Sequence, residues 1–175
     1  MLVCSKVDLN EAQNAEDTLF LLNTYATDIM GGGERLCDYT QEHLIAELRK
    51  RPTAHVFIAR VDNKPAGLGI CFEGFSTFAC KPLINIHDFC VSPDFRRQGV
   101  ATKRLQTIEE FARSIGCCKL TLEVLEGNVP AKTLYQSVGF EGYKLDPASG
   151  KAVFWQKKST TIHQFQHSTC SNFLP

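Results

Sequence analysis

Apolar residues follow two patterns along the chain, a periodic repeat and short continuous runs, and each pattern predicts one type of secondary structure. A repeat of three and four residues, typical of an amphipathic helix, starts at Ala15 and again at Ala101. Short apolar runs bounded by turn residues are typical of strands. The patterns predict helices at 13–29, 40–50, 99–115 and 129–138, and strands at 54–61, 66–72, 83–91, 118–125, 140–145 and 151–157. This order indicates one α/β domain with a mixed, mostly antiparallel sheet.

Turn and capping residues set the expected ends of these elements. The glycines Gly31–Gly33 end the first helix, and Thr40 can cap the second. The segment Asp62–Pro65 is expected to form the turn of a hairpin. Gly116 and Gly139 follow the third and fourth helices, where a left-handed residue commonly ends a helix.

The composition is that of a globular domain. The chain has 175 residues, of which 43% are apolar and 22% are charged, so it can bury a core without disulfides or a metal. No apolar run approaches the roughly 20 residues that span a bilayer. Residues 1–10 show no basic segment followed by an apolar one, so we expect no secretory signal.

Charge is balanced overall but unevenly distributed. The formal net charge is zero, which argues against nucleic-acid binding, because phosphate contacts demand a basic excess. Residues 1–50 hold nine acidic and four basic side chains, whereas residues 92–120 hold six basic and three acidic ones. The acidic and the basic segments could bind two ligands of opposite charge. The alternative interpretation is that these side chains form an ordinary solvated surface.

The eight cysteines show no pattern typical of a metal site or a disulfide framework. None forms a C-x-x-C pair, and Cys117 and Cys118 are a bare doublet. Several lie in apolar runs, among them Cys71 and Cys90, where cysteine packs as a small apolar residue. We expect reduced thiols in a cytoplasmic protein and no metal site, because no set of zinc ligands at workable spacing can be assembled.

The segment 91–101 carries the most specific chemistry in the sequence. It joins a predicted strand to a predicted helix, and Gly99 and Ala101 allow a tight turn with open N–H groups. Arg96 and Arg97 add charge to the positive end of the helix dipole, so the segment is typical of a phosphate-binding loop. Neither the Rossmann nor the P-loop glycine pattern is present. A tight turn with solvated arginines is the alternative interpretation.

Two motifs resemble the signatures of the GNAT N-acetyltransferase superfamily. The first is Arg96-x-x-Gly99-x-Ala101, preceded by a Val-x-Pro sequence, and it resembles the coenzyme A pyrophosphate loop. The second spans residues 128–140 and reads Asn-x-x-Ala-x-x-Leu-Tyr-x-x-x-Gly-Phe. The core of the resemblance covers residues 54–145, and the one mild departure is Ala101, where the family more often has glycine.

The resemblance implies the fold and the place of the cosubstrate. We expect a single GNAT-like domain over residues 1–158, followed by an uncharged tail at 159–175. Its sheet would have about seven strands, splayed between the fourth and the fifth, with about four flanking helices. Acetyl-CoA would lie where these strands separate, its pantetheine amides pairing with the exposed strand backbone.

The same resemblance assigns residues to acetyl-CoA binding. They are Phe89, Cys90, Val91, Arg96, Arg97, Gln98, Gly99, Val100, Ala101, Thr102, Asn128, Ala131 and Tyr135. Asn128 could instead cap the helix that follows it. Direct transfer from a thioester to an amine needs neither a metal nor an enzyme nucleophile, so none of the cysteines has to be catalytic.

An amine acceptor must lose a proton before it can attack, since only about one part in 2,500 of a lysine-like amine is neutral at pH 7. His87 ranks first as the base, directly or through water, because the resemblance places that position toward the acceptor. Asp88 ranks second and Glu123 third. Strict alternation would put Asn85, His87 and Phe89 on one face of their strand and Asp88 on the other. A satisfied buried histidine is the alternative interpretation.

Tyr135 matches the general acid of the family by position. It lies beside the apolar stripe of its predicted helix, not on it, which suits a hydroxyl directed into a cleft. A core aromatic side chain is the alternative interpretation.

The acceptor site is less defined. By the family layout it would draw on Tyr25, Asp28, Met30, Gly31–Gly33, Glu34 and Phe72–Phe78, among which Asp28, Glu34 and Glu73 could hold a cation. The central region resembles diamine N-acetyltransferases, which favours a small, cationic primary amine as acceptor, and a homodimer is compatible with it. The alternatives are a protein or peptide N-acetyltransferase and a non-catalytic coenzyme A sensor.

Overall fold

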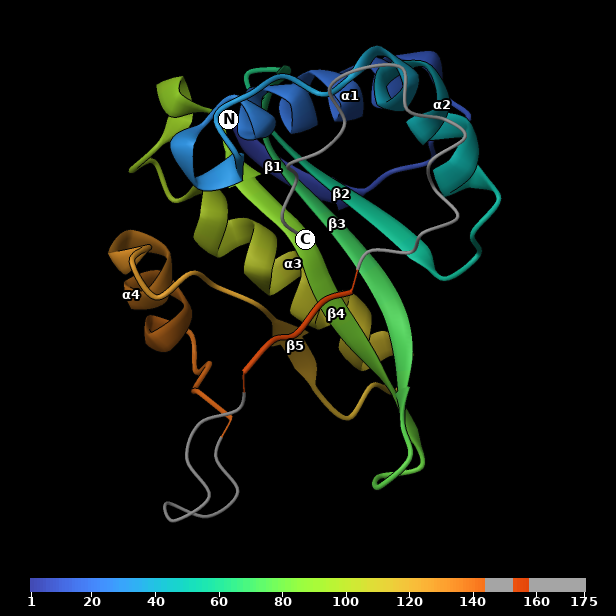
Figure 1. Cartoon of the computed structure of the whole chain (residues 1–175), viewed down its shortest axis with the longest axis vertical. Helices are drawn as coiled ribbons and strands as arrows, with labels where there is room; N and C mark the ends of the chain where they lie inside the picture. The colour runs from blue at the N-terminus through green and yellow to red at the C-terminus, as the bar shows by residue number, and fades with distance from the viewer. Residues whose placement is uncertain (144–152, 158–175) are drawn as a thin grey trace. The chain divides into compact units, whose positions relative to one another are not determined.

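The protein is described here from a computed structural model, over residues 1–143 and 153–157. The chain divides into two compact units, residues 1–123 and a C-terminal unit that begins at Val124. In chain order the elements are β1 (Leu2–Lys6), α1 (Ala12–Ala26), the 3-10 helix η1 (Ile29–Gly31), α2 (Asp38–Arg49), β2 (Ala54–Val61), β3 (Lys64–Ser76), β4 (Lys81–Val91), the 3-10 helix η2 (Pro93–Phe95), α3 (Val100–Ser114), β5 (Leu120–Leu122) and α4 (Val129–Ser137) (Figure 1).

The strands β1 to β5 form one sheet in chain order. The first four are antiparallel to their neighbours, and β5 joins β4 in parallel. β4 pairs with β3 from Lys81 to Val91 but with β5 only over Ile84 to Ile86. The fourth and fifth strands therefore part after Ile86, as the expected splay requires.

Helices cover both faces of this sheet. α1 and α2 lie on one face, where Leu21 and Ile45 pack in one cluster with Ile58 and Ile70 of the strands (Figure 1). α3 lies on the other face, where Val100 packs on small residues of β2 and β3. Leu21, Ile58 and Ile70 are at most 2% exposed, and each such side chain contributes about 1.5–3 kcal/mol by its burial.

Element boundaries largely follow the predicted ones. β2 occupies the predicted range, and the hairpin turn after it contracts to Asp62 and Asn63, both with left-handed backbone (φ of 48° and 65°), as a two-residue hairpin turn requires. The expectation that Thr40 caps the second helix is wrong. α2 begins two residues earlier, at Asp38, so Cys37 occupies the N-cap and Thr40 lies within the first turn.

The C-terminal unit contains α4. Asn128 caps the start of this helix, because its side chain accepts a hydrogen bond from the Ala131 amide (3.3 Å). The expected closing strands are not seen where they can be checked, since residues 140–143 and 153–157 are not in strands. An apolar run becomes a strand only when a neighbour is available to pair with it. Within the described residues the sheet thus has five strands, not about seven. The predicted tail at 159–175 lies outside the described residues.

Among the described residues, the cysteines follow the expectation with one exception. Free thiols are present at Cys4, Cys71, Cys80, Cys90, Cys117 and Cys118. Cys37 differs, because it is disulfide-bonded, so the expectation of reduced thiols throughout is wrong for this residue. Burial raises the pKa of the Cys71 thiol to about 12 and that of Cys90 to about 11, which keeps both protonated and unreactive at neutral pH. No helix among the described residues is long and apolar enough to cross a membrane.

Candidate active site

A β-bulge interrupts β4 at the residues predicted to do acid–base work. Asp88 pairs with Ile70 of β3, whereas Ile86 pairs with the next residue, Cys71, so His87 has no partner of its own in the register. Such an extra residue shifts the alternation of side chains along a strand. The expectation of strict alternation is therefore wrong at this point.

The bulge brings His87 and Asp88 to the face covered by α1. The His87 ring contacts the ring of Phe72 edge-on, with centroids 5.4 Å apart. Phe72 packs against the cluster beneath α1, and the negative charge of Asp88 helps to raise the pKa of Tyr25 in α1, after burial. Phe89 instead lies on the opposite face, where the Arg104 guanidinium of α3 stacks 3.9 Å from its ring centre. The two candidate bases thus share a face that Phe89 does not.

His87 and Asp88 differ in their surroundings. His87 is exposed, whereas Asp88 is half-buried. Burial raises the pKa of Asp88, and the adjacent His87 partly opposes this shift. No described residue donates a hydrogen bond to the Asp88 carboxylate, although Tyr25 lies near enough for its own pKa to respond. A partly desolvated carboxylate next to an imidazole is a pair that can accept and relay a proton.

The second half of β4 has an open edge. After Ile86 no described strand pairs with it on the side away from β3, so the backbone from His87 to Val91 can accept an added extended chain there. Phe89, Cys90 and Val91, predicted to hold pantetheine through their backbone, lie on this stretch.

The loop after β4 presents a run of free amides. The N–H groups from Arg97 to Thr102 donate to no other described residue, and the first helical bond is that of Lys103 to the Gly99 carbonyl (3.0 Å). Arg97 and Gly99 have left-handed backbone (φ of 61° and 77°), a geometry that turns successive N–H groups toward one side. A Cβ on Gly99 would meet no atom within 4 Å, so the space beside it is open. The geometry is that of a phosphate-binding helix start.

The two arginines of the loop have different partners. Arg97 is exposed and makes no ion pair with another described residue. Arg96 donates through Nη2 to Oδ2 of Asp28 (2.7 Å) and through Nε to the Val91 carbonyl (3.4 Å). Asp28 was expected to be available to a cationic acceptor, but one carboxylate oxygen holds Arg96 and the other accepts from the Met30 amide (2.9 Å).

Arg104 is a residue of this region that the sequence patterns do not single out. Its side chain is fully buried under the sheet, against Phe89. A Cβ on Gly67 of β3 would collide with the guanidinium, and Gly69 lies beside the same side chain. Two glycines inside one predicted strand were the available signal, because glycine in a strand often marks the close approach of another group.

Asn128, Ala131 and Tyr135 all belong to the C-terminal unit. Asn128 caps α4 on the Ala131 amide, so the capping interpretation holds for its side chain. Tyr135 is 8% exposed, and its ring lies 5.8 Å from that of Phe140 in a tilted arrangement. Glu123, the third candidate base, is exposed and lies just after β5.

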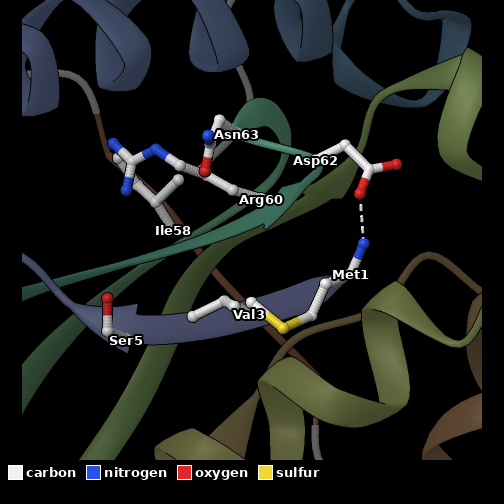
Figure 2. A pocket seen from close by; sticks show the side chains of 7 residues that line it. All are labelled: Met1, Val3, Ser5, Ile58, Arg60, Asp62 and Asn63. Atoms are coloured by element: carbon white, nitrogen blue, oxygen red, sulfur yellow. Dashed lines mark hydrogen bonds and ion pairs between the residues drawn. The ribbon is translucent and has the colours of Figure 1, made fainter.

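A hollow of about 380 Å³ lies elsewhere, at the β1–β2 edge of the sheet. Figure 2 shows Met1, Val3 and Ser5 of β1 on one side, with Ile58 and Arg60 of β2 above them, and an ion pair between the Met1 amine and Asp62. None of the predicted site residues lines it. The candidate site is therefore the second half of β4 and its following loop.

The comparison with protein families agrees with this geometry. The acetyltransferase (GNAT) family matches residues 19–140, a stretch that includes the bulge, the phosphate loop and α4. The chain belongs to this family.

Named relatives agree with the assignment. A thialysine N-epsilon-acetyltransferase of Caenorhabditis elegans is 32% identical over 101 residues, which are 58% of this chain and 62% of that protein. The match thus spans less than two thirds of that relative. An aminoglycoside acetyltransferase from an uncultured soil metagenomic sample shares the fold, with a TM-score of 0.71 at 19% identity over 90% of this chain and 97% of its own. AAC(6')-Iy, solved in complex with the bisubstrate analogue CoA-S-monomethyl-acetylneamine, gives a TM-score of 0.71 at 16% identity, over 91% of this chain and 99% of its own.

Proposed function

We propose that this GNAT protein is an acetyl-CoA-dependent N-acetyltransferase that acetylates the primary amine of a small molecule. The observation that carries the proposal is the run of free amides from Arg97 to Thr102, directly after a strand with an open edge. A phosphate group at a helix start and an extended amide chain along a strand edge are the two features that coenzyme A presents.

The residues present fit acetyl-CoA as cosubstrate. Amides of the loop would hold the pyrophosphate, and the exposed Arg97 side chain would add charge to it. The backbone of Phe89 to Val91 would pair with the pantetheine amides, as an added strand does. The bound thioester supplies an activated acetyl group, so the protein has only to orient it and manage protons.

His87 and Asp88 are proposed to take the proton of the acceptor ammonium. They share the α1 face of β4, and His87 is exposed to an incoming amine or its water. Asp88, whose pKa burial raises, lies beside it and can stabilise an imidazolium by its charge. We keep His87 as the direct base, with Asp88 as its partner, and Glu123 as a weaker third candidate.

Tyr135 is proposed as the proton donor to the departing thiolate, on the resemblance of its motif to the second signature of the family. Its phenolic hydroxyl can donate a hydrogen bond to sulfur. Its burial supports a fixed orientation.

A small cationic amine is the proposed acceptor, on two grounds. The named relatives include an acetyltransferase of thialysine, a small amine. Residues 1–50, which include α1 and η1 on the α1 face of β4, carry the acidic excess of the chain. A cytoplasmic location, a homodimer and the domain limits 1–158 stay predictions.

A screen of acceptors tests the proposal. The purified full chain is given acetyl-CoA with polyamines, thialysine and lysine, aminoglycosides, or peptides with free N-termini, and release of coenzyme A is followed. Transfer to a small amine with kcat/KM well above that for peptides is the expected result. Transfer to peptides alone would favour a protein N-acetyltransferase, and binding of coenzyme A without any transfer would favour a sensor.

A further inference from the structure

The loop between α1 and α2 is built around one residue, Asp28. Its backbone carbonyl accepts from the amides of Gly31 (2.8 Å) and Gly33 (3.0 Å). One oxygen of its side chain caps η1 on the Met30 amide (2.9 Å). Both the backbone carbonyl and the carboxylate of Asp28 thus hold the segment 28–33 in its conformation.

This loop is also held closely against the end of α1. A Cβ on Gly31 would collide with the Tyr25 carbonyl oxygen, so only glycine fits there. The Tyr25 hydroxyl donates to the Met30 carbonyl (3.4 Å), and the charge of Asp88 reaches the same Tyr25. The loop 28–33 therefore lies on the same face of β4 as the two candidate bases.

The Arg96 side chain joins this loop to the phosphate loop. Arg96 binds Oδ2 of Asp28 at 2.7 Å and the carbonyl of Val91, the last residue of β4, at 3.4 Å. The Arg96 bond lowers the pKa of Asp28, second to the Met30 amide, so the pair is ionised at neutral pH. The neighbouring Arg97 has no such partner within the described part of the chain, and it is exposed.

We propose that Arg96 is a positioning residue that fastens the loop 28–33 to the end of β4, and that it is not a ligand of the phosphates. The pair Arg96–Asp28 would then set the acceptor side of the site, while Arg97 and the loop amides bind the cosubstrate. The assignment to the acceptor side rests on the proposed function. The fastening of the loop itself does not, because it can be measured in the free protein.

Hydrogen exchange of the free full-length protein tests the fastening. In Arg96→Gln and in Asp28→Asn, the Gly31 and Gly33 amides are expected to exchange roughly tenfold faster, because a hydrogen-bonded ion pair is lost. Asn at position 28 can still accept from the Met30 amide, so this variant keeps the cap of η1 and removes the charge. The double variant is expected to exchange no faster than either single one, because the two residues act through one contact. Arg35→Gln, which breaks an exposed ion pair with Asp38 nearby, is the matched control and should leave these amides unchanged.

Ligand measurements separate the two roles. Arg96→Gln and Asp28→Asn are expected to raise KM for the acceptor roughly tenfold while the Kd of coenzyme A stays within about threefold. Arg97→Gln is expected to raise the Kd of coenzyme A roughly tenfold while the KM for the acceptor stays within about threefold. Equal weakening of coenzyme A binding by Arg96→Gln and Arg97→Gln, with Gly31 and Gly33 exchange unchanged, would overturn the proposal. If no amine is acetylated by the unmodified protein, the proposed function fails, and the exchange and coenzyme A results still decide the role of Arg96.

Discussion

The two halves of β4 differ in what surrounds them, although they belong to one strand. From Ile84 to Ile86 the strand is paired on both sides, and Ile84 is fully buried. From His87 onward the described strands pair with it on one side only, it is bulged, and its residues are half-buried or exposed. The first half, Ile84–Ile86, is closed, because neighbouring strands occupy both of its edges. The second half, His87–Val91, is open, because its backbone and side chains are available to a ligand. The candidate site thus begins where regular pairing with the described strands stops.

The largest effect is expected from His87, in the open half. His87→Ala should lower turnover roughly 10²- to 10⁴-fold at neutral pH if it is the base, with a residual rate that rises with pH as neutral amine becomes available. Stability should change little, because the side chain is exposed. Steady-state kinetics across pH, with a thermal melt, checks both parts. A silent His87→Ala beside a damaging Asp88→Asn would reverse the ranking of the two residues.

Ile84, in the closed half, is expected to show the opposite behaviour. Ile84→Ala leaves a cavity in the sheet and should lower the free energy of unfolding by about 2–5 kcal/mol. The affinity of the remaining folded protein for coenzyme A should stay the same. Denaturant unfolding and calorimetry measure the two quantities. A selective loss of coenzyme A affinity at unchanged stability would mean that the two halves are not distinct.

Tyr135 extends the comparison to the second family motif. A thiolate whose conjugate acid has a pKa of about 8.5 can leave without full protonation, so a hydrogen bond from the Tyr135 hydroxyl should help only moderately. Tyr135→Phe is expected to lower kcat roughly 10- to 10³-fold and to change coenzyme A affinity only a few-fold. Single-turnover kinetics with separate binding measurements checks this. An unchanged chemical rate would identify Tyr135 as a packing residue.

The smallest effect concerns His55, on β2 opposite Cys71. It is 7% exposed, its ring meets Phe111 edge-on, and its Nε2 lies 3.6 Å from Glu73 Oε2. Burial lowers the pKa of His55, Lys6 lowers it further, and Glu73 partly opposes them. Because the folded pKa lies below the unfolded value of about 6.5, the stability that neutral His55 contributes is present above that pH and is lost as the pH falls.

A pH series of denaturant unfolding curves tests this. Between pH 7 and 5 the free energy of unfolding should fall, by no more than about 1.4 kcal/mol per pH unit for one proton. His55→Gln should show a shallower slope over the same range. An identical slope in the variant would assign the pH dependence to other groups.

The sequence predicts the regular parts of this molecule and not its irregular ones. The range of β2 and the tight turn at Gly99 after β4 follow from local signals, a hydrophobic run in one case and a glycine in the other. The bulge at His87 has no local signal, because alternation is assumed unless a partner strand forces a shift. The burial of Arg104 likewise depends on space that glycines on another strand provide.

The contact between Arg96 and Asp28 shows the same limit. Both residues were candidates from the sequence, each for a different ligand, yet they bind each other. They are far apart in the chain, so only the folded arrangement of α1 beside β4 brings them together. Sequence patterns supply candidate residues here, and tertiary structure decides what each of them contacts.

Calorimetry with coenzyme A, on the unmodified chain and on two glycine variants, tests the central claim most directly. Gly99 and Gly116 have nearly the same left-handed φ, 77° and 76°, and both have open space beside them. Valine at either position therefore carries similar backbone strain, but only Gly99 lies in the phosphate loop. We expect the unmodified protein to bind coenzyme A, Gly116→Val to retain that affinity when folded, and Gly99→Val to lose roughly tenfold or more, since a side chain there blocks the loop amides. Coenzyme A binding that is equal in the two folded variants would contradict the account.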